Sequence, residues 1–103
     1  MNKRIKVLYF AVNKKAELIE IENNLPELQR LVSGYIQVVL ISKNLCIICN
    51  ELGKIENLPY QEKYRINGDF VVAQTYRDEL VSIDEDSADK IIKEMPNLTS
   101  ILL

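Results

Sequence analysis

The first quarter of the chain predicts a pair of adjacent strands. Residues 5–12 are rich in β-branched and aromatic side chains, which favour strand conformation. In residues 17–22 glutamate alternates with leucine and isoleucine, so this strand is expected to be half-buried with Glu20 and Glu22 facing solvent. The polar residues 13–15 lie between the two strands, and the whole segment predicts a hairpin.

Residues 25–33 carry the clearest helical pattern, with apolar side chains at helical spacing. Asn24 can cap this helix, Glu27 stands three residues later, and Pro26 falls in the first turn, where its missing N–H costs nothing. Gly34 is expected to end the helix, because glycine adopts the left-handed conformation without a steric penalty.

Two strongly apolar runs follow the helix. Residues 35–41 are interrupted only by Gln37 and predict a central strand with both faces covered. Residues 45–50 predict a second buried strand. The turn of residues 51–54 then places Gly53 where a positive φ is expected.

The second half of the chain begins with a less regular segment. Residues 55–68 show no clear periodicity and end in a turn pair that includes Gly68. Residues 69–75 and 79–83 predict two short strands. The acidic residues 84–86 open a second helix, because acidic side chains favour the positive end of the helix dipole.

The second helix has apolar residues at helical spacing and is expected to end at Pro96. Residues 96–103 form an apolar tail to which the pattern assigns no structure. The order of elements is therefore β-β-α-β-β-loop-β-β-α. It predicts one domain over residues 1–103 with an α+β fold, in which a small, mainly antiparallel sheet is accompanied by two short helices.

The composition narrows the range of functions. The chain has 103 residues, a net charge of −2 and no histidine. Without histidine there is no imidazole base, no Ser–His or Cys–His nucleophile pair and no histidine ligand for a metal. We therefore expect a protein without enzymatic activity, with no catalytic residues and no cofactor. A hydrolase that depends on paired carboxylates is the remaining enzymatic alternative.

The two cysteines, Cys46 and Cys49, form a C-x-x-C string. They fall within a predicted strand, where residues three apart point to opposite faces, so the two sulfur atoms are expected to diverge. A zinc site would need further histidine or cysteine ligands, which the chain lacks. We interpret both as buried, unreactive thiols and expect no metal site.

The N-terminal part predicts neither a signal sequence nor a membrane anchor. The apolar run of residues 7–12 is too short for either, so we expect a cytoplasmic protein with no membrane partner. Basic side chains gather near this end, at Lys3, Arg4, Lys6, Lys14 and Lys15. Because the chain is net acidic, with a pI near 5.2, no direct binding of nucleic acid is expected.

A strongly acidic segment covers residues 69–89, with seven acidic side chains and one arginine. An acidic face can dock on a basic surface of another protein. The candidate interaction residues are Asp78, Glu79, Asp84, Glu85 and Asp86. The alternative interpretation is helix capping together with solubility, which accounts for residues 84–86 without any partner.

Polar loop residues after the strand at 45–50 form a candidate site for a small ligand, because loops mounted on a sheet often carry binding residues. The candidates come from the 50–54 turn and the 57–66 loop and are Asn50, Glu51, Lys54, Tyr60, Tyr64 and Arg65. The two cations would pair with phosphate, and a tyrosine would stack on a nucleotide base. The alternative is an ordinary polar turn followed by a loop with surface tyrosines.

Several strings within residues 25–83 resemble a known family. They are LQRLVSGYIQVV at 28–39, ICNELGK at 48–54, LP at 58–59 and GDFVV at 68–72. Their order and spacing are similar to those of a family of small proteins of phages, plasmids and conjugative elements, which is catalogued as a domain of unknown function. The chain departs from the family pattern at Asn57, where glycine is usual, and at residues 61–62, where Asn-Arg is usual.

The resemblance implies a mobile genetic element as the setting, in a bacterial cell or in the host cell of a phage. With the acidic segment, it leads us to expect a non-enzymatic accessory protein that binds a host or element protein and can inhibit host defence. The alternative is a module that binds a nucleotide or another anion. The apolar strands and tail would also allow a homodimer about a two-fold axis.

Overall fold

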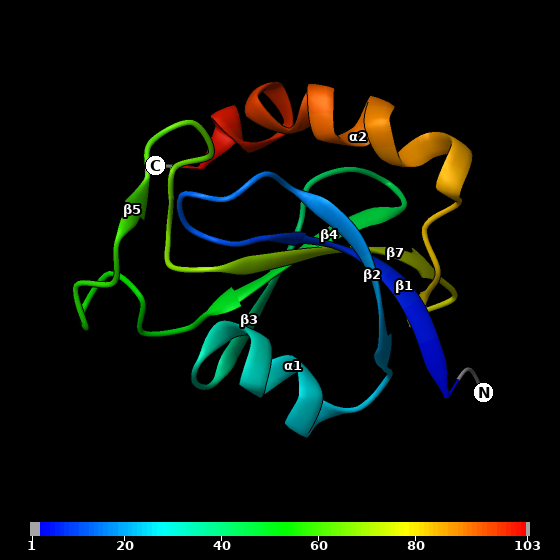
Figure 1. Cartoon of the computed structure of the whole chain (residues 1–103), viewed down its shortest axis with the longest axis horizontal. Coiled ribbons are helices and arrows are strands. Elements are labelled where there is room, and N and C mark those ends of the chain that lie inside the picture. Colours follow the sequence, from blue (N-terminus) through cyan, green and yellow to red (C-terminus); the bar gives the residue numbers. More distant parts are fainter. Residues whose placement is uncertain (1–2, 103) are drawn as a thin grey trace.

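The computed structural model of this chain describes residues 3–102 and has an α+β fold (Figure 1). The strands of its main sheet are β1 (Arg4–Phe10), β2 (Glu17–Glu22), β3 (Ile36–Leu40), β4 (Leu45–Asn50), β7 (Phe70–Tyr76) and β8 (Glu79–Val81). They lie in the order β2-β1-β7-β4-β3, β8 pairs with β7, and every pairing is antiparallel. The predicted fold class is confirmed.

One helix covers each face of the main sheet (Figure 1). The face under α1 (Leu25–Val32) has a core that includes Ile5, Val7, Cys46, Ile48 and Val71. The face under α2 (Glu85–Leu98) has a core that includes Leu8, Phe10, Ile47, Phe70 and Val72. Neighbouring residues of one strand, such as Ile47 and Ile48, pack into the cores on opposite faces of the sheet because side chains alternate along a strand.

The hairpin of β1 and β2 and the start of α1 follow the sequence pattern. Strand β2 has the bounds expected from the alternation, and Glu20 and Glu22 are exposed. The side chain of Asn24 caps α1, since its Oδ1 accepts a hydrogen bond from the N–H of Glu27 at 2.9 Å. These predictions are confirmed. Each depends on the pattern of a single strand or on a contact between residues that are close in the sequence.

The residues that end α1 and shape the next turn differ from the prediction. Ser33, with a φ of 62°, adopts the left-handed conformation in place of Gly34. Gly34 is needed for close approach, because a Cβ there would lie 2.7 Å from Nδ2 of Asn50. Gly53 likewise has no positive φ, and a Cβ on it would lie 2.8 Å from the carbonyl oxygen of Asn67. At both positions glycine is required by a close tertiary contact and not by the local turn geometry.

The prediction of a central, doubly covered strand at residues 35–41 is wrong. The segment forms β3, which pairs only with β4 and lies at the end of the sheet. Its side chains Val38 and Leu40 are 53% and 65% exposed. An apolar run does not specify how many neighbours a strand has, and the equally apolar β7 takes the place between β1 and β4.

The prediction that Pro96 ends the second helix is also wrong. Helix α2 continues through Pro96 to Leu98, and a 3₁₀ turn, η1 (Thr99–Ile101), follows it. The buried Met95 anchors this end, and its carbonyl oxygen accepts a hydrogen bond from Oγ1 of the buried Thr99 at 2.9 Å. Residues 96–101 of the unassigned tail are therefore helical, and Leu98 and Leu102 pack against the core, whereas Leu103 lies outside the described residues.

The segment between β4 and β7 contains a second, small sheet that the sequence pattern does not predict. Strands β5 (Tyr60–Gln61) and β6 (Ile66–Asn67) pair with each other, and Gly68 follows them with a φ of 89°. Within residues 3–102 no helix is both long enough and apolar enough to cross a membrane.

Candidate functional site

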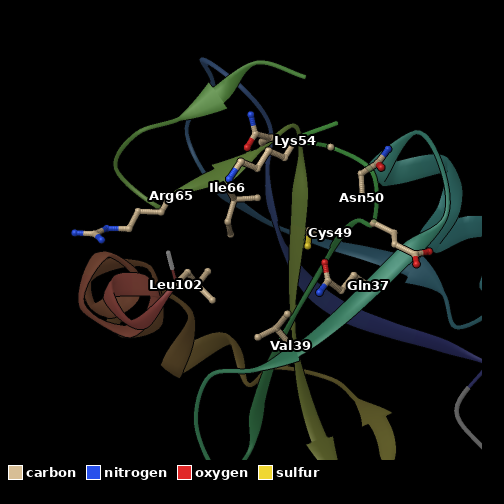
Figure 2. A pocket seen from close by; sticks show the side chains of 11 residues that line it. Gln37, Val39, Cys49, Asn50, Lys54, Arg65, Ile66 and Leu102 are labelled. Atoms are coloured by element: carbon tan, nitrogen blue, oxygen red, sulfur yellow. The ribbon is translucent and has the colours of Figure 1, made fainter. Parts of the chain in front are cut away.

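Two adjoining hollows lie at the open end of the β3–β4 hairpin, away from its turn. They bring several of the predicted ligand residues together. The first has a volume of about 240 Å³ and is drawn in Figure 2. Its walls come from β3, β4, the 50–54 turn, the β5–β6 hairpin and the C-terminal end of the chain, and they include Gln37, Val39, Cys49, Lys54, Arg65, Ile66 and Leu102. The second, of about 480 Å³, is lined by Lys54, Asn57, Tyr60, Arg65 and Asn67.

Lys54 and Arg65 line both hollows, and neither forms an ion pair within residues 3–102. The Lys54 side chain extends toward Ile66, whereas the guanidinium group of Arg65 points outward (Figure 2). Arg65 has a φ of 61°, a conformation that is uncommon outside glycine. The turn between β5 and β6 thus brings Arg65 to the same two hollows as Lys54, although the two residues are eleven positions apart in the sequence.

Asn50 and Tyr64 serve the fold at this end of the molecule. Asn50 lines the first hollow, as Figure 2 shows, but it is buried and its side chain makes three internal hydrogen bonds. The ring of Tyr64 meets those of Phe10 and Phe70 edge-on, with centroid distances of 5.0 Å and 5.5 Å. The exposed Tyr60, which lines the second hollow, is therefore the tyrosine available for stacking on a ligand, and Glu51 is the acidic side chain that lines the first.

The two cysteines lie on opposite faces of the sheet, as the strand geometry predicts. Cys46 belongs to the core under α1, and Cys49 packs against the core under α2, where it also lines the first hollow. Both are free thiols, and burial raises the pKa of each. A thiol with a raised pKa is a weak nucleophile at neutral pH, so Cys49 contributes an apolar surface to the hollow.

The candidate acidic residues Asp78, Glu79, Asp84, Glu85 and Asp86 are all exposed. Asp84 caps α2, and its Oδ1 accepts a hydrogen bond from the N–H of Asp86. Glu85 forms an ion pair with Lys6, which lowers the pKa of the Glu85 carboxyl and raises the pKa of the Lys6 ammonium. Capping and pairing thus account for the first two acids of the helix, as the alternative interpretation expects.

An apolar groove on the α1 side of the sheet is the feature that sequence reasoning missed. It has a volume of about 700 Å³ and lies between α1, β3, β4 and the β7–β8 hairpin. Its apolar lining consists of Leu28, Ile36, Val38, Leu40, Cys46, Ile48, Tyr76 and Leu80. The short helix α1 leaves this part of the sheet uncovered, and Tyr76 is 61% exposed beside the groove. Lys43, Arg77 and Asp78 supply the charged part of the lining.

The free edge of the sheet borders this groove. Tyr35 O accepts a hydrogen bond from Glu51 N, and Ile41 N donates one to Leu45 O, so both residues direct backbone groups toward the β4 side. Hydrogen-bonded and non-bonded pairs alternate in an antiparallel ladder, which leaves the intervening residues Ile36, Val38 and Leu40 with backbone groups directed outward. The same three side chains line the groove. The sequence did carry a signal for this surface, namely the apolar run of residues 35–41, which lacks the alternation of polar and apolar residues expected of a strand with one face in solvent.

Comparison with known proteins identifies a family but no individual relative. A family model described as "Domain of unknown function (DUF3846)" matches residues 5–96. The match is wider than the 25–83 segment that carries the resembling strings, and it takes in β2 and most of β1 and α2. No curated protein and no solved structure gives a significant match.

Proposed function

The chain belongs to the DUF3846 family, a domain of unknown function, and from that premise we propose that it is a non-enzymatic protein-binding module. The proposed binding surface is the apolar groove together with the β3 edge that borders it. The occupant is a protein partner that presents an apolar segment to the groove. The proposal also includes the mobile-element setting and a host-defence target, for which the resemblance of the strings in residues 25–83 is the support.

The observation that carries the proposal is the exposure of apolar side chains around the groove. Val38, Leu40 and Tyr76 are each more than half exposed, although they lie side by side with buried core residues. Soluble proteins rarely leave a continuous apolar patch uncovered unless it meets a partner. A tyrosine beside a groove is also a residue type that contributes strongly to binding energy at protein interfaces.

The charged part of the lining gives the surface specificity. Lys43 and Arg77 line the groove together with Asp78, which belongs to the acidic segment predicted to take part in protein interactions. A partner with an apolar segment flanked by acidic side chains would match the two cations. Charges of this kind steer association and select among partners more than they add affinity.

The test compares two tyrosine variants of similar exposure. Tyr76 lines the groove and is 61% exposed, whereas Tyr60 lies in the second hollow and is 56% exposed. Wild type, Tyr76→Ala and Tyr60→Ala are immobilised and challenged with bacterial lysate, and the retained proteins are quantified by mass spectrometry. We expect a protein that wild type and Tyr60→Ala retain and that Tyr76→Ala loses by about tenfold or more. Equal retention by all three, or no retained protein, contradicts the proposal.

A second candidate function is binding of a nucleotide or a similar anion in the adjoining hollows. The observation that favours it is the pair of cations, Lys54 and Arg65, which share both hollows without an ionic partner in the described part of the chain. Thermal-shift measurements with nucleotides and cyclic dinucleotides test it, because a ligand that binds the folded state raises its apparent stability. Here Tyr60→Ala and Lys54→Ala are expected to abolish the shift and Tyr76→Ala to preserve it. The absence of any shift at millimolar nucleotide removes this candidate.

A further inference from the structure

We infer that β3 pairs with β3 of a second copy of this chain, antiparallel and about a two-fold axis at Val38, so that the two sheets become continuous. The inference rests on the proposed function in one respect, namely that the β3 edge is a protein-binding surface. It goes further because it names a second copy as the occupant of that edge.

The two edges of the sheet differ in the way that such pairing requires. The β2 edge carries Glu17, Glu20 and Glu22, and charged side chains on an edge strand oppose pairing with another strand. The β3 edge reads Ile-Gln-Val-Val-Leu and contains no charge and no proline. An uncharged edge with unpaired backbone groups is a template for one more strand.

The β3 edge is complementary to itself. Its outward-directed residues are Ile36, Val38 and Leu40, and Val38 is the middle residue of the strand. Antiparallel pairing centred on Val38 sets Val38 opposite Val38 of the second copy and Ile36 opposite Leu40 in both directions. This register uses the whole strand, matches apolar with apolar side chains, and supplies about six backbone hydrogen bonds.

The same register also enlarges the groove. A two-fold axis between antiparallel strands runs perpendicular to the sheet, so equivalent faces of the two copies lie on the same side. In the single chain, α1 lies beside β3 on one side of the sheet (Figure 1). In the dimer, both α1 helices would therefore lie on the same side of one continuous sheet, with the β3 strands of the two copies between them. The two grooves become neighbours, and the dimer presents a longer apolar surface to the partner of the proposed function.

The position of Val38 on the axis allows a decisive test. Val38→Lys places two lysines opposite each other and Val38→Asp places two aspartates opposite each other, whereas a mixture of the two variants pairs lysine with aspartate. Because Val38 is 53% exposed in the single chain, either charge can remain in water and the fold is expected to survive. Ile55→Lys is the matched control, since Ile55 is 81% exposed and lies outside the β3 edge and the groove.

The measurement is molar mass by light scattering after size exclusion, over a series of protein concentrations, with circular dichroism to verify folding. We expect the molar mass of a dimer for wild type and Ile55→Lys, and the molar mass of a monomer for each Val38 variant alone. In the mixture of the two Val38 variants the molar mass of a dimer should return. Each variant alone should raise the dissociation constant more than about tenfold. A single-chain wild type, dimers that persist in both variants, or a mixture that does not reassociate would each overturn the inference.

The tyrosine variants separate this inference from the proposed function. Tyr76 lies on β7 and not on the β3 edge, so Tyr76→Ala is expected to keep the two-chain mass. If Tyr76→Ala remains a dimer but no longer binds the protein partner, both proposals are supported. A dimer without any groove-dependent partner contradicts the proposed function alone, and a groove-dependent partner on a single-chain protein contradicts the dimer alone.

Discussion

Asn50 is expected to be one of the most important polar residues for stability, and Asn50→Ala tests this. The side chain lies at the end of β4 and is 5% exposed. Its Nδ2 donates to the carbonyl oxygens of Val32 at 3.0 Å and Ser33 at 3.2 Å, and its Oδ1 accepts from the N–H of Leu52 at 2.8 Å. One amide thus ties the C-terminal end of α1 to β4 and to the turn that follows.

The magnitude follows from these three hydrogen bonds. Each contributes about 1 kcal/mol net, and alanine would leave the carbonyl oxygens of Val32 and Ser33 and the N–H of Leu52 without this partner at a buried site. We therefore expect Asn50→Ala to lower the free energy of unfolding by about 3 kcal/mol, a large part of the roughly 5–15 kcal/mol typical of a single domain. Asn50→Asp should cost about as much at neutral pH, because it retains the bond from Leu52 but sets a carboxylate against two carbonyl oxygens.

Urea unfolding followed by circular dichroism measures both effects, with the free energy obtained by linear extrapolation. Asn97→Ala is the matched control, since Asn97 is an exposed residue of α2 and its replacement should change the free energy by less than about 0.5 kcal/mol. The aspartate variant should recover part of its loss in acid, where a protonated carboxyl can donate to a carbonyl. A loss below about 1 kcal/mol for Asn50→Ala would refute the reasoning.

Three further predictions concern α2, the thiols and the ion pair. Pro96→Ala should stabilise the protein by about 1–2 kcal/mol in the same urea assay, because the helix continues through this residue and alanine restores a backbone donor. Cys46 and Cys49 should react with a thiol reagent far more slowly in the native protein than in urea, since burial raises the pKa of both, and equal rates would contradict this. Glu85 should titrate by NMR below its ordinary pKa, and Lys6→Met should bring its pKa back. Since the folded pKa of this carboxyl is lowered, its contribution to stability is present above the ordinary carboxyl pKa and is lost as the pH falls through the folded value.

The elements that the sequence determined are those specified by neighbouring residues. The alternation in residues 17–22 and the apolar run at 45–50 gave the bounds of β2 and β4, and Asn24 identified the cap of α1. Strand alternation also separated the two cysteines onto opposite faces. In each case the relevant contact lies within a few residues or follows from the period of one element, so local pattern is sufficient.

The candidate sites depend on which strands become neighbours, and local pattern does not carry that information. Lys54 and Arg65 were candidates from their loops, but only the β5–β6 hairpin brings both to the same hollows. Tyr64 looked like a surface ring, but its contacts with Phe10 and Phe70 leave it partly buried against the core under α2.

The tertiary structure alone decided the features on which the proposals depend. The apolar run of β3 has the composition of a central strand, yet the order of pairing places it at the edge, where Val38 and Leu40 are exposed. In the same way, burial of Met95 in the core under α2, beside residues such as Phe10 and Phe70, carries the helix past a proline that would end a helix in isolation. The physical reason is common to both, since hydrophobicity favours burial without selecting the neighbour, and the partner that is chosen lies far away in the chain.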